Sequence, residues 1–195
     1  MPTGGTADVY LGQDETLSTT EYGDNGTNST GFQISEISDL DADHDSSVDE
    51  AYAEVGNSSG DGSLTAWAYV GRTFEVKDNS GSQDATITFN GGLFGAMSLD
   101  GASNYVKAEM TVEDQTDDEK YDEVLYEKSD YIGSIDENIT DSTIVPLEAG
   151  HFYGVKAEVL AEITVTEAGD TAISDFHRDG SRDGWLYWDQ VDIKF

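Results

Sequence analysis

Residues 153–166 read YGVKAEVLAEITVT, a stretch in which an apolar side chain occupies nearly every second position. A period of two places successive side chains on opposite faces of a β-strand. One face would carry Tyr153, Val155, Ala157, Val159, Ala161, Ile163 and Val165, and the other Gly154, Lys156, Glu158, Leu160, Glu162, Thr164 and Thr166. The stretch therefore predicts a long strand with one face in a core and the other facing solvent.

Most of the chain after residue 63 follows the same period. We expect further strands at residues 65–76, 85–99, 106–112, 123–132, 139–147, 171–176 and 185–195, with a bulge at Gly91-Gly92. Turn residues separate them, as in the sequence Asp78-Asn79-Ser80-Gly81. This spacing leaves little room for helices and predicts an all-β fold, an antiparallel jelly-roll β-sandwich of about eight strands.

One motif supports a resemblance to known proteins. Residues 146–153 read PLEAGHFY, and they are followed by the long alternating strand and by a closing strand of the form Trp-x-x-Val-x-Ile-x-Phe. This half of the chain, residues 84–195, resembles the jelly-roll capsid, turret and decoration proteins of haloarchaeal viruses, and also carbohydrate-binding β-sandwich domains. The resemblance implies a fold and brings no catalytic or ligand-binding residues with it.

The first 63 residues differ in composition from the rest. They are rich in Gly, Ser, Thr, Asn and Asp, which favour turns and loops. Val48, Ala51, Tyr52 and Val55 recur at helical spacing, so a short helix is expected near residues 46–55. The predicted organisation is an acidic, polar and mostly irregular N-terminal arm at residues 1–63, followed by a jelly-roll domain at residues 64–195.

The charge of the chain indicates its environment. It has 41 acidic and 9 basic residues, a formal net charge of −32, and no Lys or Arg before Arg72. Such a chain repels itself unless salt screens it, and at ~1 M salt the Debye length is about 3 Å. We therefore expect a halophilic protein. Binding of nucleic acid or of an anionic membrane is disfavoured, because both need Lys and Arg.

Several sequence features bear on location. Cysteine is absent, so the stability of the fold must come from packing. The N-terminus lacks the basic and apolar regions of a signal peptide, and no segment reaches the roughly 20 apolar residues of a membrane span. The expected locations are a high-salt cytoplasm and the virion assembled there, with the cell surface or extracellular space as the alternative.

Residues 39–50 contain the sharpest candidate for a metal site. Alternating acids closed by a twelfth-position acid are typical of calcium loops, although His44 stands where the sharp turn needs Gly. Solvated acids of a halophilic linker would give the same pattern. No cofactor is required by the sequence, and the candidate ligands for Ca²⁺ or Mg²⁺ are Asp39, Asp41, Asp43, Asp45 and Glu50.

Catalytic residues are not indicated. The sequence Gly56-Asn57-Ser58-Ser59-Gly60 matches the Gly-x-Ser-x-Gly nucleophile elbow, but it lies in a polar segment before a predicted strand, whereas the elbow needs a strand before it and a helix after it. His44, His151 and His177 are the histidines available as general bases, and no spacing links them to Ser58. We therefore expect no enzymatic activity.

Exposed tryptophan is the remaining candidate feature. Trp67, Trp185 and Trp188 could contact a glycan or a neighbouring subunit, or they could fill the core. Trp185 and Trp188 have opposite parity, so at most one of them faces the core of a regular strand. A contact with a subunit or with the N-terminal arm is the favoured interpretation.

Taken with the resemblance, these features favour a structural protein of a halophilic, haloarchaeal virus particle. It would be a capsid, turret or decoration subunit that forms homo-oligomers in high salt and contacts other virion proteins, with neither nucleic-acid binding nor membrane insertion. The alternative is a surface or secreted carbohydrate-binding module that binds glycan through exposed tryptophan.

Overall fold

The strand that decides the fold is present as β11 (Phe152–Val165) in the computed structural model. Its predicted inner face is buried throughout: Tyr153, Val155, Ala157, Val159, Ala161 and Ile163 are fully buried, and Val165 is nearly so. Tyr153 also stacks on Phe74, with ring centroids 5.2 Å apart. The period-two interpretation of residues 153–166 is therefore confirmed.

The structure describes residues 7–176, 178–179 and 182–195. Within them the one helical element is a 3₁₀ turn, η1 (Ile34–Glu36). The other strands are β1 (Ala7–Val9), β2 (Glu15–Leu17), β3 (Tyr22–Thr30), β4 (Ile37–Asp45), β5 (Glu50–Asn57), β6 (Gly62–Val76), β7 (Ser82–Asp100), β8 (Ser103–Asp114), β9 (Glu119–Ser129), β10 (Gly133–Glu148), β12 (Thr171–Phe176), β13 (Arg178–Asp179), β14 (Arg182–Asp183) and β15 (Trp185–Lys194). No helix in these ranges is long and apolar enough to span a membrane.

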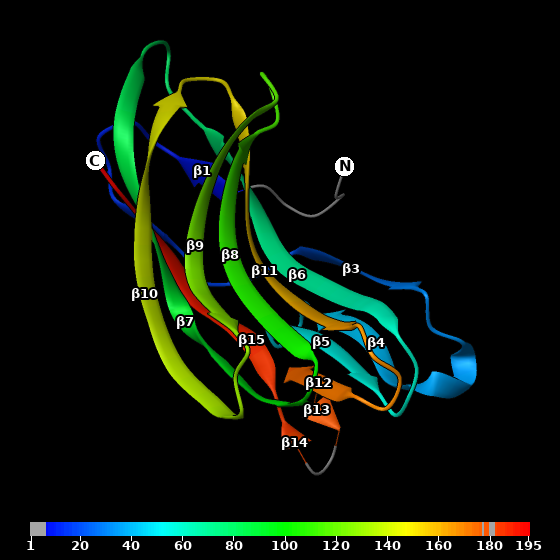
Figure 1. Ribbon diagram of the computed structural model, residues 1–195. Coiled ribbons are helices and arrows are strands. Elements are labelled where there is room, and N and C mark those ends of the chain that lie inside the picture. The colour runs from blue at the N-terminus through cyan, green and yellow to red at the C-terminus, as the bar shows by residue number, and fades with distance from the viewer. Residues whose placement is uncertain (1–6, 177, 180–181) are drawn as a thin grey trace.

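The strands form two packed sheets, and β13 and β14 form a separate two-stranded ribbon (Figure 1). The first sheet has the order β1-β6-β11-β8-β9, and β3 also pairs with β6. The second sheet contains β10, β7, β12, β5, β15 and β2, and β4 joins it through β5. The inward faces of both sheets share one apolar core. The predicted all-β sandwich is confirmed, and its finer assignment as a jelly roll stays a prediction.

The central strands pair in a nested pattern. The innermost pair is the β8–β9 hairpin, and β7–β10, β6–β11 and β5–β12 follow outward from it. All these pairs are antiparallel, and β7–β10 extends from Ser82↔Glu148 to Met97↔Gly133. Successive pairs alternate between the two sheets. The short connections between consecutive strands from β5 to β12, apart from the β8–β9 turn, therefore cross from one sheet to the other.

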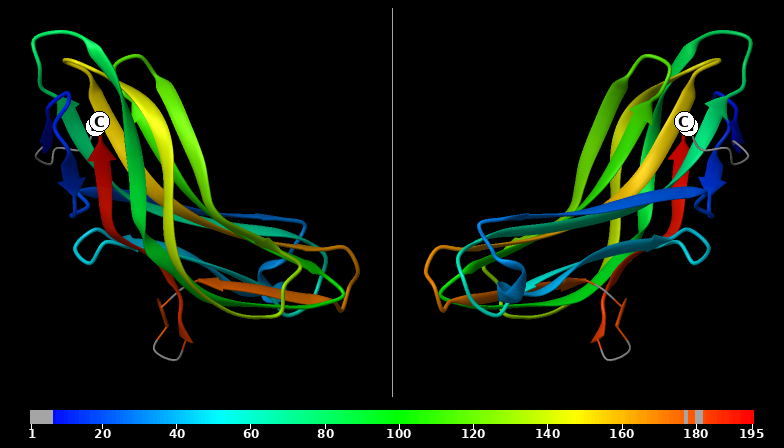
Figure 2. Two further views of the ribbon diagram at one scale, coloured as in Figure 1. Left: turned by 90° about the vertical axis from the view of Figure 1, so that its left-hand side faces the viewer. Right: turned by 90° about the vertical axis from the view of Figure 1, so that its right-hand side faces the viewer.

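The long strands bend strongly along their length, as the side views show (Figure 2). β7 continues through Gly91-Gly92, and the bulge predicted there lies on the partner strand β15, between Trp188 and Gln190. A Cβ atom on Gly91 would lie 2.1 Å from the carbonyl oxygen of Tyr187, and one on Gly92 would lie 2.5 Å from its ring. Glycine is needed here because another strand approaches too closely for a side chain.

The N-terminal segment differs from the prediction. Residues 7–57 were expected within an irregular arm, but they form β1 to β5 and add strands to both sheets. Their turn-forming composition was misleading because backbone pairing with longer strands overrides local propensity. β3, for example, has the polar sequence YGDNGTNST and pairs with β6 from Tyr22↔Gly71 to Thr30↔Ser63.

The helix expected near residues 46–55 is wrong. Glu50–Asn57 is strand β5, which pairs with β4, β12 and β15. Ala51, Ala53 and Val55 face the core at a period of two, whereas Val48 is exposed in the preceding turn. Ala and Val at spacings of three and four fit a helix, but three strand partners stabilise the extended conformation instead.

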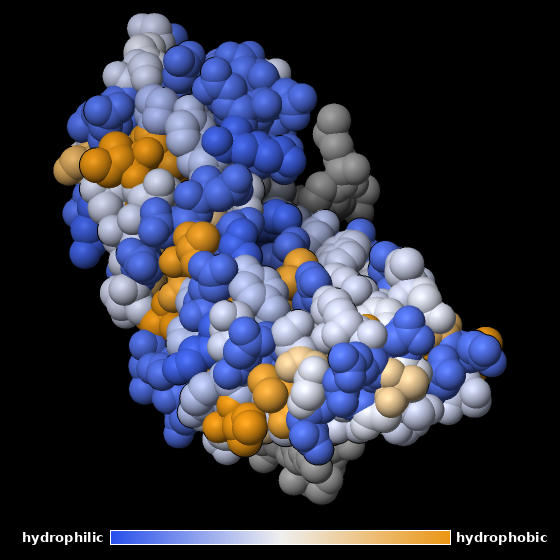
Figure 3. Space-filling model, in the orientation of Figure 1, coloured by the Kyte–Doolittle hydropathy of each residue, from blue (hydrophilic) through white to orange (hydrophobic). Residues whose placement is uncertain are grey.

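The surface is predominantly hydrophilic on the face drawn in Figure 3, where apolar residues form small separate groups. Basic side chains pair with acids two positions away in the chain, as in Lys77–Glu75, Lys107–Glu109 and Lys156–Glu158. These pairs use few of the 41 acids. Most of the negative charge therefore has to be screened by solvent ions.

Candidate functional site

The acidic run at residues 39–50 does not form a loop. Asp39, Asp41, Asp43 and Asp45 lie at alternate positions of β4, on the face opposite buried Ala42, and Asp45 lies across from Glu50 of β5. Side chains on one face of a strand are about 7 Å apart along it, whereas a calcium loop converges on one point. The loop geometry is wrong, and cation binding by these acids stays a prediction.

The three tryptophans lie in three different environments. Trp67 lies on the outer face of the first sheet, parallel to Tyr69 at 6.0 Å, and against Gly26 of β3. Trp188 is buried, with 3% of its surface exposed, and donates from Nε1 to the carbonyl of Leu17 over 3.3 Å. Trp185 is half-buried on the outer face of the second sheet, so only one of Trp185 and Trp188 faces the core, as their opposite parity predicted. They do not form one surface.

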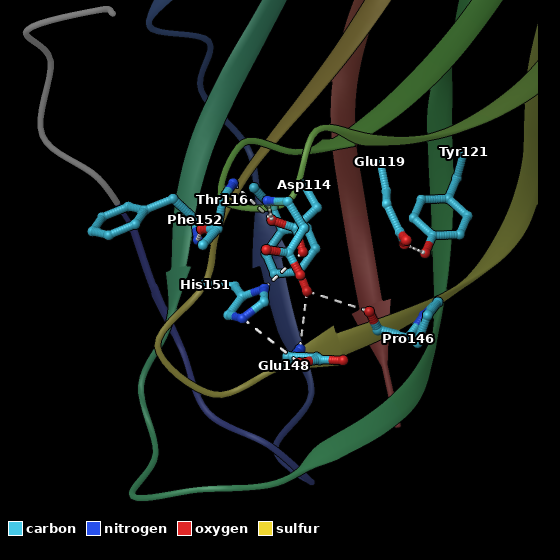
Figure 4. A network of polar contacts seen from close by, with 10 residues as sticks. Asp114, Thr116, Glu119, Tyr121, Pro146, Glu148, His151 and Phe152 are labelled. Carbon is cyan, nitrogen blue, oxygen red and sulfur yellow. Dashed lines mark hydrogen bonds and ion pairs between the residues drawn. The ribbon is translucent and has the colours of Figure 1, made fainter.

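A polar cluster that was not predicted lies where the β8–β9 and β10–β11 turns meet (Figure 4). His151, just before β11, has Nδ1 2.8 Å from Oδ2 of Asp114, the last residue of β8, and Nε2 3.6 Å from Oε2 of Glu148. Asp114 Oδ1 also accepts hydrogen bonds from the backbone N–H groups of Thr116 and Asp117. The cluster thus joins two turns that are far apart in the sequence.

Tyr153 explains part of the PLEAGHFY motif. Its hydroxyl accepts a hydrogen bond from the Glu148 N–H at 2.9 Å and donates one to the Pro146 carbonyl at 3.3 Å. A buried tyrosine that returns to the backbone a few residues upstream fixes the corner between two strands. Burial raises the pKa of Tyr153, so the hydroxyl stays neutral and can donate.

The electrostatics of the cluster are those of an ion pair. The hydrogen bond to Asp114 raises the pKa of His151. Burial opposes ionisation of Asp114, but the hydrogen bonds from His151, Thr116 and Asp117 outweigh it and lower the pKa of this carboxyl. A charge-assisted hydrogen bond of this kind is stronger than one between neutral groups. The cluster therefore favours imidazolium beside carboxylate.

Asp114, Asp117 and His151 could also hold a divalent cation. Their ligand atoms all lie within 4.8 Å of one another, and this is the group with such spacing among the residues whose side chains the structure describes. A metal ion would need a deprotonated His151 nitrogen, whereas Nδ1 is within hydrogen-bonding distance of Asp114. The observed contacts therefore correspond to the ion pair.

The other catalytic candidates are separated. Ser58 follows β5 and bonds through Oγ to the carbonyl of Glu36, and the chain enters β6 rather than a helix. His44 lies on β4, with Nδ1 3.3 Å from Oδ1 of Asn25. His177 lies outside the described residues, as do the side chains of Arg178 and Arg182. Within the described part of the chain, nothing brings Ser58 together with a histidine.

Part of the His151 cluster had a signal in the sequence. Glu148, His151 and Tyr153 all lie in the PLEAGHFY motif, but Asp114 lies in a different segment. It reaches His151 because β8 pairs with β11 in the register Tyr153↔Asp114. Such a register cannot be read from one sequence.

No protein-family model, curated protein or solved structure matches this chain.

The ion pair predicts a pH-dependent stability. The pKa of His151 is higher in the folded protein than in the unfolded chain. Its contribution to the free energy of unfolding is therefore complete below the unfolded-state pKa and is lost as pH rises through the folded-state pKa. The pKa of Asp114 is lower in the folded protein than in the unfolded chain. Its contribution to the free energy of unfolding is therefore present above the unfolded-state pKa and is lost as pH falls through the folded-state pKa. His151→Gln should therefore cost roughly 1 kcal/mol between about pH 4 and 6.5, and less on either side.

Urea titrations in molar salt across this pH range would measure the effect. A double-mutant cycle with Asp114→Asn is the control, because the coupling free energy isolates the pair from other consequences of each substitution. A coupling free energy near zero at about pH 5 would contradict the ion pair.

Proposed function

We propose that this protein is a structural subunit of a halophilic, haloarchaeal virus particle, a jelly-roll capsid, turret or decoration protein that self-assembles in high salt. The observation that carries the proposal is the nested pairing of β8–β9, β7–β10, β6–β11 and β5–β12. An antiparallel ribbon folded back on itself and wrapped into two sheets gives this pairing, and two-sheet jelly rolls of this kind are common in viral capsids.

The negative charge supports assembly in molar salt. Copies of a chain with a net charge of −32 repel one another at low ionic strength, and screening removes most of that repulsion when the Debye length falls to about 3 Å. Partners without a basic surface, including other copies of the chain, can then approach and bind without strong electrostatic repulsion. Nucleic acid stays a poor partner, because its phosphates need basic side chains.

β3 is the sheet edge that suits self-association best. It pairs with β6 along one side, and in the described residues no strand pairs with its other side. Residues 25–30 have no charged side chain, and Thr27 to Thr30 are exposed. The other long edge strands carry several acids each, which prevent edge-to-edge pairing: Asp41, Asp43 and Asp45 on β4, Asp122 and Glu127 on β9, and Asp136 and Asp141 on β10.

Sedimentation combined with light scattering, in about 2 M KCl, tests the proposal. The wild-type protein should form a discrete closed oligomer, because homo-oligomers usually have closed point-group symmetry. Asn28→Glu with Thr30→Glu should shift it to the monomer, since both substitutions charge the exposed part of β3. The matched control is Ser129→Glu with Ser142→Glu, which adds the same charge to the edge strands β9 and β10.

The oligomeric states of the wild-type protein and of the two variants distinguish three results. A control variant that stays oligomeric while the β3 variant dissociates supports the subunit function and places the contact at β3. Dissociation of both variants would assign the effect to total charge instead. A wild-type monomer at every salt concentration, with and without Mg²⁺ and Ca²⁺, contradicts the proposed function.

A further inference from the structure

Three aromatic rings gather on the outer face of the second sheet. Phe94 of β7 pairs with Trp185 of β15, and their ring centroids are 5.4 Å apart. Tyr187, two residues further along β15, stacks on Phe94 at 5.7 Å with an interplanar angle of 17°. All three rings are half-buried, so each keeps some surface in contact with solvent. We call Phe94, Trp185 and Tyr187 the aromatic platform.

The orientation of Tyr187 is fixed by its neighbours. The ring lies over Gly92, where a Cβ atom would be 2.5 Å from Cε1. Its hydroxyl donates a hydrogen bond to Oδ1 of Asn138 on β10, the strand beyond β7. The ring thus crosses β7 and lies flat along the sheet. The platform is preorganised, which reduces the entropy lost on binding.

Amide and hydroxyl groups continue the surface beside the platform. Thr140 donates to Oδ1 of Asn90, and Nδ2 of Asn90 lies 3.3 Å from Asp192. Gln190 contacts the same carboxylate through Nε2 at 3.2 Å. These groups lie on β10, β7 and β15, in the rows next to Tyr187. Rings beside a row of amides and one carboxylate offer both an apolar face and directional hydrogen bonds.

A shallow groove leads away from the other side of the platform. A hollow of about 300 Å³ is lined by Phe94, Ala96, Ser134 and Asp136 among others. A second hollow of about 500 Å³ shares Ala96 and Ser134 with the first and extends to Ile132. The two hollows are therefore neighbours along β7 and β10, so a ligand that extends from the platform along these strands can contact both.

The charge of the region selects among ligands. Asp136, Asp175 and Asp192 lie at the groove or beside the platform, and the net charge of the chain is −32. An anionic ligand is therefore repelled, and a lipid surface would have to desolvate the polar row. A neutral chain of hydroxyl-bearing rings fits, because its C–H faces pack on aromatic rings and its hydroxyls bond to amides and carboxylates.

We infer that the platform and its groove bind a neutral oligosaccharide, with sugar rings packed on Trp185 and Tyr187. This binding function is separate from the proposed assembly, because the platform lies on the outer face of the second sheet and β3 belongs to the first. A particle subunit that also binds glycan could attach to a glycosylated surface.

Isothermal titration in about 2 M KCl, with neutral hexasaccharides of glucose, mannose and N-acetylglucosamine, tests the inference. At least one should bind the wild-type protein, and a hexauronate of similar length should not. Trp185→Ala should weaken binding about tenfold or more through loss of the stacking contact. The matched control is Tyr69→Ala, which removes one ring of the Trp67–Tyr69 stack on the opposite face and should leave affinity unchanged.

Asn138→Ala provides a second variant that keeps every aromatic group. It removes the exposed acceptor that holds the Tyr187 hydroxyl, so the ring loses its fixed orientation and affinity should fall while circular dichroism stays native. Two results would overturn the inference: no heat of binding with any neutral hexasaccharide, or affinity that depends on Tyr69 and not on Trp185. Neither result depends on oligomeric state, so the sedimentation experiment tests the proposed function separately.

Discussion

Transfer from molar KCl to about 10 mM salt is expected to unfold this protein completely. The Debye length increases from about 3 Å to 30 Å over that range, so charges across the whole molecule begin to repel one another. With 41 acids and 9 bases, few of these interactions are attractive. The total stability of a domain is about 5–15 kcal/mol, and self-repulsion on this scale can exceed it. Circular dichroism and tryptophan fluorescence against KCl concentration would measure the midpoint.

Removal of charge from β4 is the matched test of that explanation. Asp41→Asn with Asp43→Asn removes two exposed charges from a strand that already pairs with β5, and should move the midpoint to lower salt. The same shift in NaCl and KCl would indicate screening, and a much lower midpoint in MgCl₂ at equal ionic strength would indicate bound cations. A native spectrum at about 10 mM salt would contradict the halophilic interpretation of the charge.

Trp188→Ala is expected to destabilise the fold by about 3–5 kcal/mol, the usual cost of deleting a large buried ring. Trp188 contacts Phe89 edge-on at 6.1 Å and donates from Nε1 to the Leu17 carbonyl, so the substitution leaves a cavity and removes this buried hydrogen bond. Trp185→Ala removes a ring from the same strand but from the outer face, and should cost about 1 kcal/mol or less.

Urea unfolding of both variants in molar salt measures this contrast between two residues that are three positions apart. The free energy of unfolding should fall sharply for Trp188→Ala alone. Equal losses would contradict the burial difference between the two side chains. Trp188→Phe serves as the conservative control, because it retains an aromatic ring against Phe89 but loses the hydrogen bond to Leu17.

The sequence predicted the strands wherever apolar residues alternate over long stretches. β6, β11 and β12 lie close to their expected positions because buried residues alternate with less buried ones over much of their length. β3 and β4 could not be predicted in the same way. Their side chains are mostly polar and exposed, and they are held by backbone pairing with β6 and β5, which leaves no trace in hydropathy.

The candidate site residues could likewise be predicted only in part, because strand pairing brings some of them together. Opposite parity predicts that Trp185 and Trp188 lie on different faces of β15, and the structure agrees. Which of the two is buried depends on the bulge between Trp188 and Gln190, because a regular strand would place Trp185 on the same face as buried Val191 and Ile193. The partners Phe94 and Asp114 cannot be read from the sequence, because each is brought into place by the register of a strand far along the chain. The acidic run at residues 39–45 matched a loop motif by composition, but a strand and a loop can share that composition and differ completely in geometry.

The position of β15 has a consequence for how the chain reaches its native state. This strand pairs with β7, β5 and β2, including contacts between Thr16 and Asp192 that are 176 residues apart. The second sheet therefore cannot close on the ribosome before β15 has emerged, whereas the β8–β9 hairpin can form early from local contacts. Until then the apolar faces of β5 and β7 need protection against aggregation, so folding should be slow and sensitive to chaperones.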